Sequence, residues 1–253
     1  MTRRLSSIII FGALFLGIVV AQNSVPYTRD EVATLKKKLV NALDAVGQPP
    51  AGYAKESENF SLPTDANKEH NSGLFYPANG SCDRTYGSDK AGQKSEKDLE
   101  KEYQKKLAEA QAKGDYQAIG KIAQEMQQKS GEMQLKKLEG KKVPIDIRIH
   151  INSNGGEAID PDGVLFERAG VIALKEKSDA SEEKGRVRIF FDPVSLKDTK
   201  QLSKVDMKMP EKGASSKTAV FNLTIEFDGP MAEIEAWAKK IDTGKVLAQI
   251  GGK

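Results

Sequence analysis

Polar side chains that could bind a ligand recur at every second residue in three segments. Arg148 and His150 alternate with isoleucines, Arg186 and Arg188 flank a valine, and Glu226 lies between isoleucine and phenylalanine. Successive side chains of a strand point to opposite faces, so in strands these five would share one polar face. A carboxylate near arginines and a histidine could bind an anion or mediate a contact with a partner. The alternative is a solvated face with cross-strand ion pairs.

A second group of polar side chains lies in one loop. Glu157, Asp160 and Asp162 follow Asn152 and Asn154. Oxygen ligands of this kind suit Ca²⁺. Their spacing does not match the EF-hand loop, and an Asp-Pro-Asp-Gly run also forms ordinary turns. The three carboxylates are therefore candidates for a metal site, with a plain turn as the competing interpretation.

Motifs of nucleophilic catalysis are absent from the sequence. There is no Gly-x-Ser-x-Gly elbow, and no histidine lies near the single cysteine, Cys82. The phosphate-loop and dinucleotide fingerprints are also missing. We therefore predict no catalytic residue and no cofactor, and an enzyme would have to rely on carboxylates. One cysteine excludes an internal disulfide and leaves a buried thiol, a reactive thiol or an intermolecular disulfide.

The polar alternation belongs to the segment with the clearest secondary-structure pattern. Strands are predicted over residues 143–151, 164–175 with a bulge at Gly170, 187–191 and 219–227. Helical spacing then runs from Asp228 to Gly244, and the apolar residues 246–250 predict a last strand. The expected domain over residues 141–253 is α+β, with a largely antiparallel sheet of about five strands, helix on one face and water on the other.

The preceding segments have other compositions. Thr28 and Glu31 form a capping box for a helix over residues 28–46. Gly, Pro, Ser, Asn and Asp dominate residues 47–93, which predicts an irregular segment pinned to the domain by its aromatic residues. Residues 94–140 are rich in Lys, Glu, Gln and Ala, with a helix stop and new cap at Gly114 and Asp115. We expect a charged helical hairpin here, ahead of the sheet, with one unbroken helix or a coiled coil as alternatives.

The first 21 residues have the parts of a secretory signal. Arg3 and Arg4 precede a short apolar run, and Val19 and Ala21 suit the −3 and −1 positions of a cleavage site. Cleavage after Ala21 predicts a periplasmic or secreted protein. The alternative is an uncleaved anchor in the inner membrane, the one case in which we expect membrane contact. Without Arg3 and Arg4 the chain has 37 basic and 36 acidic residues, a net charge of +1 that does not favour nucleic-acid binding.

Three functions remain open at this point. The first is a non-enzymatic cell-envelope protein that binds a partner, or a second copy of itself, through residues 94–138. The second is a small-molecule or ion-binding module that uses the aromatic-bearing loop of residues 53–86. The third is a hydrolase with carboxylate chemistry.

Overall fold

A computed structural model describes residues 24–69, 72–88, 96–139, 142–178, 181–207, 209 and 213–251. The expected signal sequence, residues 1–21, lies outside these ranges. Among the helices of the described residues, none is both long and apolar enough to cross a membrane.

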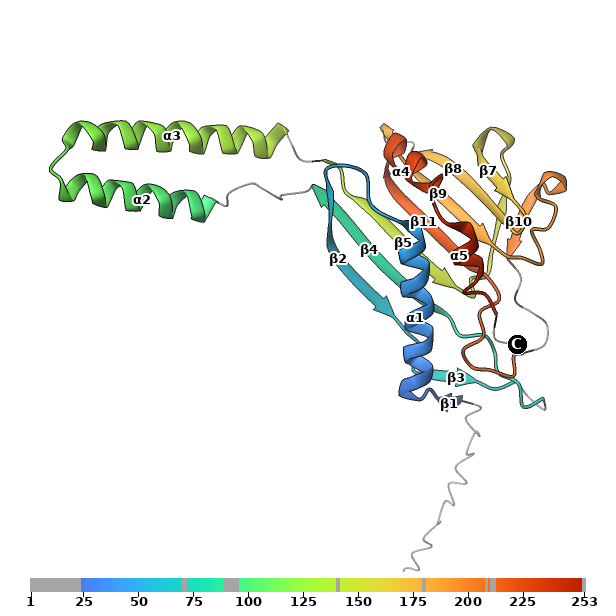
Figure 1. Ribbon diagram of the computed structural model, residues 1–253. Helices are drawn as coiled ribbons and strands as arrows, with labels where there is room; N and C mark the ends of the chain where they lie inside the picture. Colours follow the sequence, from blue (N-terminus) through green and yellow to red (C-terminus); the bar gives the residue numbers. More distant parts are fainter. Residues whose placement is uncertain are drawn as a thin grey trace, which may run out of the picture.

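The centre of the fold is a seven-stranded sheet in which every neighbouring pair is antiparallel (Figure 1). In spatial order its strands are β2 (Tyr53–Ser61), β4 (Gly80–Ser88), β5 (Ile145–Ile151), β11 (Leu223–Pro230), β9 (Ser181–Phe191), β8 (Val171–Ser178) and β7 (Val164–Arg168). The α+β class and the antiparallel sheet are confirmed. The expectation of about five strands and an irregular N-terminal segment is wrong, because that segment supplies β2 and β4.

Helices cover one face of the sheet and enclose the main core. They are α1 (Arg29–Val46), α4 (Met231–Ala238) and α5 (Thr243–Leu247). The alternating apolar residues of β5, β9 and β11 are fully buried beneath them, with Leu35 and Leu39 of α1. Trp237 of α4 donates from Nε1 to the carbonyl of Val46, which joins two of the helices. The predicted capping box is present, since Thr28 Oγ1 and Glu31 each bind the other's backbone N–H.

The opposite face is only partly open to water. Strands β6 (Gly155–Ala158) and β10 (Lys204–Met207) pair with each other as a two-stranded ribbon. Val205 and Met207 pack with Ile172, Leu174 and Phe190 of the sheet in a second, smaller core. Burial of these outward-facing side chains corrects the expectation of a wet outer face at β8 and β9. A separate short pair, β1 (Ser24–Pro26) with β3 (Asp65–Asn67), and two 3₁₀ turns, Pro161–Gly163 and Thr199–Gln201, complete the elements.

The helical hairpin exists, but it does not precede the sheet. Helices α2 (Glu96–Ala112) and α3 (Tyr116–Glu139) lie in the chain between β4 and β5, which are direct neighbours in the sheet. Figure 1 shows the two helices projecting side by side from one end of the sheet. Gly114 has φ +65°, and Asp115 Oδ1 accepts from the backbone N–H of Ala118, so the predicted stop and cap are confirmed.

Two further expectations about the C-terminal segment are wrong. Residues 243–247 form α5 instead of part of a last strand, because Asp242 caps a helix there by accepting from the N–H of Lys245. Gly170 is not a bulge within one strand. It has φ +74° and lies in the tight turn between β7 and β8. Arg168 before the turn and Val171 after it are cross-strand partners.

Candidate functional site

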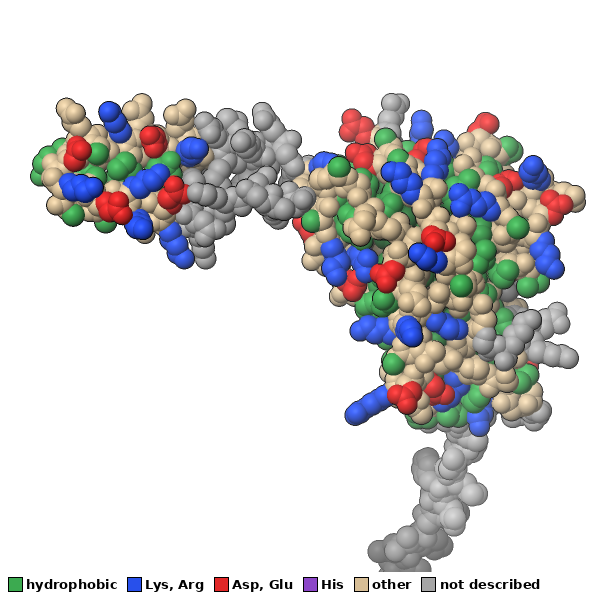
Figure 2. Space-filling model, in the orientation of Figure 1, with side chains coloured by type: hydrophobic (Ala, Val, Ile, Leu, Met, Phe, Trp, Pro, Cys, Tyr) green, Lys and Arg blue, Asp and Glu red, His purple; other side chains and the backbone are tan. Residues whose placement is uncertain are grey.

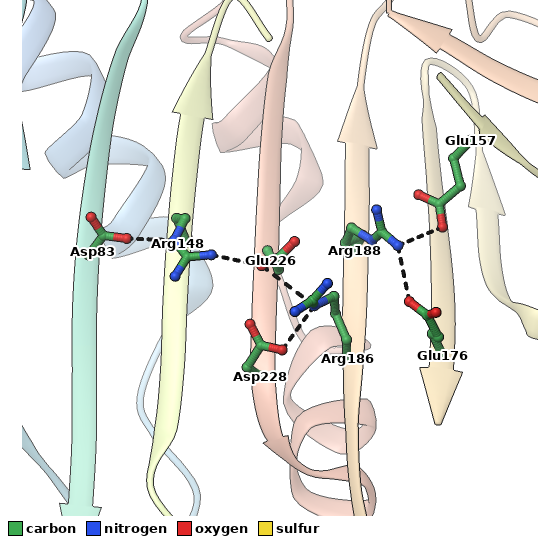
Figure 3. Close-up of polar contacts among 8 residues, drawn as sticks. All are labelled: Asp83, Arg148, Glu157, Glu176, Arg186, Arg188, Glu226 and Asp228. Carbon is green, nitrogen blue, oxygen red and sulfur yellow. Dashed lines mark hydrogen bonds and ion pairs between the residues drawn. The ribbon is translucent and has the colours of Figure 1, made fainter. Parts of the chain in front are cut away.

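The predicted polar face exists and spans neighbouring strands. On the outer face of the sheet, Arg148 of β5 is paired in register with Asp83 of β4 and Glu226 of β11, and Glu226 is paired in turn with Arg188 of β9. We use the name charged ladder for seven side chains on this face together with Glu157 of β6, which lies over it: Asp83, Arg148, Glu157, Glu176, Arg186, Arg188, Glu226 and Asp228 (Figure 3).

Two arginines connect the centre of the charged ladder. Arg148 donates from Nε to Asp83 at 2.8 Å and from Nη1 to Glu226 at 3.0 Å. Arg186 Nε lies 2.9 Å from Asp228 and 3.6 Å from Glu226. These carboxylates raise the pKa of both guanidinium groups. Burial raises the pKa of Glu226, an effect that Asp228 reinforces and Arg186 opposes.

The third arginine ties the covering ribbon to the sheet. Arg188 Nη2 lies 2.9 Å from Glu157 of β6 and 3.1 Å from Glu176 of β8. The second carboxylate oxygen of Glu157, Oε2, is buried and takes no hydrogen bond within the described part of the chain. Burial raises the pKa of Glu157, and Arg188 opposes that shift. The ion pair between Arg188 and Glu157 therefore connects β6 to the sheet.

The charge balance of the ladder argues against the anion-binding hypothesis. Three arginines face five carboxylates, a net charge of −2, and each arginine already contacts two carboxylates. An anion would have to displace one of these partners and enter a negative surface. The geometry instead favours the cross-strand ion pairs that were the alternative interpretation.

The candidate metal ligands do not converge. Glu157 faces Arg188, whereas Asp160 Oδ1 accepts from the backbone N–H of Asp162 and caps a 3₁₀ turn. The three residues border an open hollow of about 620 Å³ together with Lys175 and Lys177. Within the described residues, no three His, Cys, Asp or Glu side chains are grouped so that they could hold a metal ion. The role of Asp160 as a turn cap favours the plain turn, which was the alternative to a metal site.

His150 lies apart from the ion pairs, one rung further along the sheet. Its cross-strand neighbours are Ser81 and Thr224, which are uncharged. Burial lowers the pKa of His150, the positive charge of Arg148 lowers it further, and Asp83 partly offsets both. The imidazole is therefore neutral at physiological pH. It borders a hollow of about 420 Å³ at the end of the sheet, formed where β2 and β5 end and β4 begins.

Asn152 and Asn154, which were noted beside the candidate metal ligands, also border this hollow, whereas three further side chains were not predicted from the sequence. Ser61, Asn79 and Ser81 come from or next to strands β2 and β4, which were not predicted. The two tyrosines that flank residues 53–86, Tyr53 and Tyr86, are buried in the main core, whereas Tyr76 within the segment is 52% exposed and does not border the hollow. Polar residues do alternate with a buried one in β4, since Cys82 lies between Ser81 and Asp83. The sequence did not reveal this pattern, because Cys82 was interpreted for its thiol chemistry and not as an apolar core residue.

Cys82 is a core residue. Its side chain is fully buried, and burial raises the pKa of the thiol to about 12. A neutral, inaccessible thiol neither attacks a substrate nor pairs with a second chain while the protein is folded. The structure therefore supports the buried-thiol interpretation.

Comparison with known proteins leaves the function to be argued from this geometry alone. No protein-family model, no curated protein and no solved structure matches the chain.

Proposed function

We propose that this chain is an exported cell-envelope protein, periplasmic or secreted, that binds a partner protein through its helical hairpin. The sheet domain acts as the support and the hairpin as the recognition element. The role is non-enzymatic, because each arginine of the charged ladder is already paired with two carboxylates.

The observation that carries this proposal is where the hairpin is inserted. Strands β4 and β5 remain paired as far as Tyr86 and Ile145, and the N–H of Lys142 donates to Ser88 Oγ at 2.9 Å. Antiparallel strands whose ends lie this close can be joined by a two-residue turn. The chain instead places residues 89–141 between them, and α2 and α3 pack chiefly against each other. An insertion that the sheet does not need for its register is a good candidate for a binding element.

The surface of the hairpin suits a protein partner. Tyr103 and Ala110 are buried between the helices, whereas Tyr116, where the chain enters α3, is 84% exposed. Large aromatic side chains are enriched among the residues that contribute most to protein interfaces. Residues 96–139 contain nine acidic and nine basic residues. Figure 2 shows both charges interspersed over the part of the hairpin that it colours. A net charge of zero favours neither nucleic acid nor an anionic membrane.

Site-specific cross-linking in the cells that make the protein tests the proposal. A photoreactive amino acid replaces Tyr116 in one variant and, in the control, Val194, another exposed apolar residue, which lies in the sheet domain and is 69% exposed. We expect one discrete cross-linked species from position 116 and none from position 194. An adduct of twice the chain mass identifies self-association, and another mass identifies a different partner. The absence of adducts at both positions, or the same adducts from both, contradicts the proposal.

A further inference from the structure

The hollow beside His150 has an unusually uniform lining. Its volume is about 420 Å³, and its polar residues are Ser61, Asn79, Ser81, His150, Asn152, Ser153 and Asn154. That volume is within the range of small-ligand sites. Among the described residues that border it, none is Lys, Arg, Asp or Glu, and none is Phe, Tyr or Trp. The side chains of Asn79, Ser81 and Asn154 take no hydrogen bond from the described part of the protein, so their donors and acceptors are available.

The wall of the hollow is held rigidly by Asn152. This residue is 1% exposed and has φ +55°. Its Nδ2 donates to the carbonyls of Ala78 and Ala219, at 2.8 and 2.9 Å, and its Oδ1 accepts from the N–H of Phe221 at 2.7 Å. One side chain thus connects the approach to β4, the end of β5 and the approach to β11. Polar groups held in place before binding lose less entropy when a ligand arrives.

Two polar groups next to this wall are buried without partners. Asn222 is fully buried and its Oδ1 accepts from the N–H of Ser153, but its Nδ2 has no partner in the described residues. Thr224, the cross-strand neighbour of His150, is 7% exposed, and its Oγ1 also lacks one there. Buried polar groups are normally hydrogen-bonded. Neither residue borders the hollow itself, but each adjoins a residue that does, Asn222 through its bond from Ser153 and Thr224 as the cross-strand neighbour of His150.

The chemistry of the lining selects the ligand class. The described lining has no cationic side chain to neutralise an anion, and Arg148, two residues from His150 in β5, is already paired with Asp83 and Glu226. Among the described residues of the lining there is also no carboxylate to neutralise a divalent cation, and Ile151 is the one large apolar residue, which does not suit an apolar ligand. Hydroxyl, amide and neutral imidazole groups instead match partners that both donate and accept hydrogen bonds. We propose that this hollow, which we call the His150 pocket, binds an uncharged saccharide.

A glycan array followed by calorimetric titration tests this inference with the full mature chain. The probes are neutral hexose and N-acetylhexosamine oligomers, with sulfated and sialylated oligomers as charged controls. The test variant carries Asn79→Ala and Asn154→Ala, and because both positions are exposed we expect the fold to stay intact. The matched control is Asn59→Ala, an exposed amide on β2 that does not border the pocket.

We expect neutral oligomers to be retained on the array. The double substitution should weaken the tightest of them by about tenfold or more, as expected for the loss of two hydrogen bonds, while Asn59→Ala leaves the affinity unchanged. Retention of no neutral oligomer overturns the proposal, as does stronger retention of the charged ones. Equal affinity of the double variant and the wild type would place any binding elsewhere. Because the hairpin does not contribute to this pocket, none of these outcomes depends on the partner proposal.

Discussion

At the scale of single residues, Asn152 stands out because it combines an unfavourable backbone conformation with three buried hydrogen bonds. A non-glycine residue at positive φ is costly, and asparagine is among the few that tolerate it. The three bonds explain why the conformation persists here. They close the end of the sheet at which the His150 pocket lies.

Two substitutions separate the backbone from the hydrogen-bonding contribution of Asn152. Asn152→Gly keeps the backbone conformation but leaves two carbonyls and one N–H without their partner, and we expect it to lower the free energy of unfolding by about 3 kcal/mol. Asn152→Ala loses the same bonds and should cost about 1 kcal/mol more, because alanine disfavours positive φ. Urea unfolding measures both. The exposed neighbour Asn154→Ala is the control, with an expected change within about 0.5 kcal/mol. Equal losses for glycine and alanine would contradict the role given to the backbone.

His150 should make stability depend on pH in a defined direction. Burial and Arg148 lower its pKa in the folded protein below the ordinary 6.5, despite the opposing charge of Asp83. The unfolded chain therefore binds a proton at a higher pH than the folded chain does. The contribution of His150 is complete above about pH 6.5 and is lost as the pH falls through the folded-state pKa. Glu157 and Glu226, whose pKa values are raised, act in the opposite sense, and their contribution is lost as the pH rises through the folded-state values.

Comparison of the wild type with His150→Gln isolates the histidine from these opposing carboxylates. Between about pH 7.5 and pH 5 we expect the wild type to lose more stability than the variant, because only the wild type takes up a proton at this position on unfolding. Thermal unfolding across this range measures the difference. Parallel stability profiles for the two proteins would show that the imidazole titrates alike in the folded and unfolded states.

At the scale of elements, a strand could be predicted from the sequence where its apolar and polar residues alternate regularly. The apolar residues of β5 and β11 alternate strictly, so both strands and the shared face of Arg148, His150 and Glu226 were predictable. Strand β2 has one buried residue, Tyr53, and its register shifts between Lys55 and Ser57. An edge strand with so few buried residues and a broken alternation has no two-residue pattern to detect, because its conformation depends on pairing with β4.

Because β2 and β4 could not be recognised as strands, half of the His150 pocket and the position of the hairpin could not be predicted from the sequence either. Ser61 and Ser81 become neighbours only through the pairing of β2 with β4. Residues 94–140 were recognisable as helical from composition, but their place inside a strand–strand connection was not, because β4 had not been identified as a strand. In contrast, Gly114 and Asp115 predicted the break between the helices from local chemistry alone.

At the scale of the whole molecule, the hairpin and the sheet should be separable. Replacement of residues 89–141 by an Asn-Gly turn would connect Ser88 to Lys142 through two residues, and these two ends already lie within hydrogen-bonding distance of each other. Because α2 and α3 pack chiefly against each other, the sheet loses little buried surface. A shorter connection also lowers the entropic cost of pairing β4 with β5. We therefore expect the excised chain to fold with a melting temperature equal to that of the full chain, within about 3 °C, or higher.

This excision distinguishes a recognition element from a structural one. If the hairpin serves recognition, the shortened chain keeps its fold and its affinity at the His150 pocket but no longer forms the partner complex. If the hairpin is needed for β4 to pair with β5, the shortened chain becomes insoluble or loses its cooperative unfolding transition, and the partner proposal loses its main support. Peptide 96–139 alone provides the complementary measurement by circular dichroism. Within residues 100–131, where the structure describes the side chains, only Tyr103 and Ala110 are buried. We therefore expect the peptide to be only partly helical, because the sheet no longer holds its two ends together.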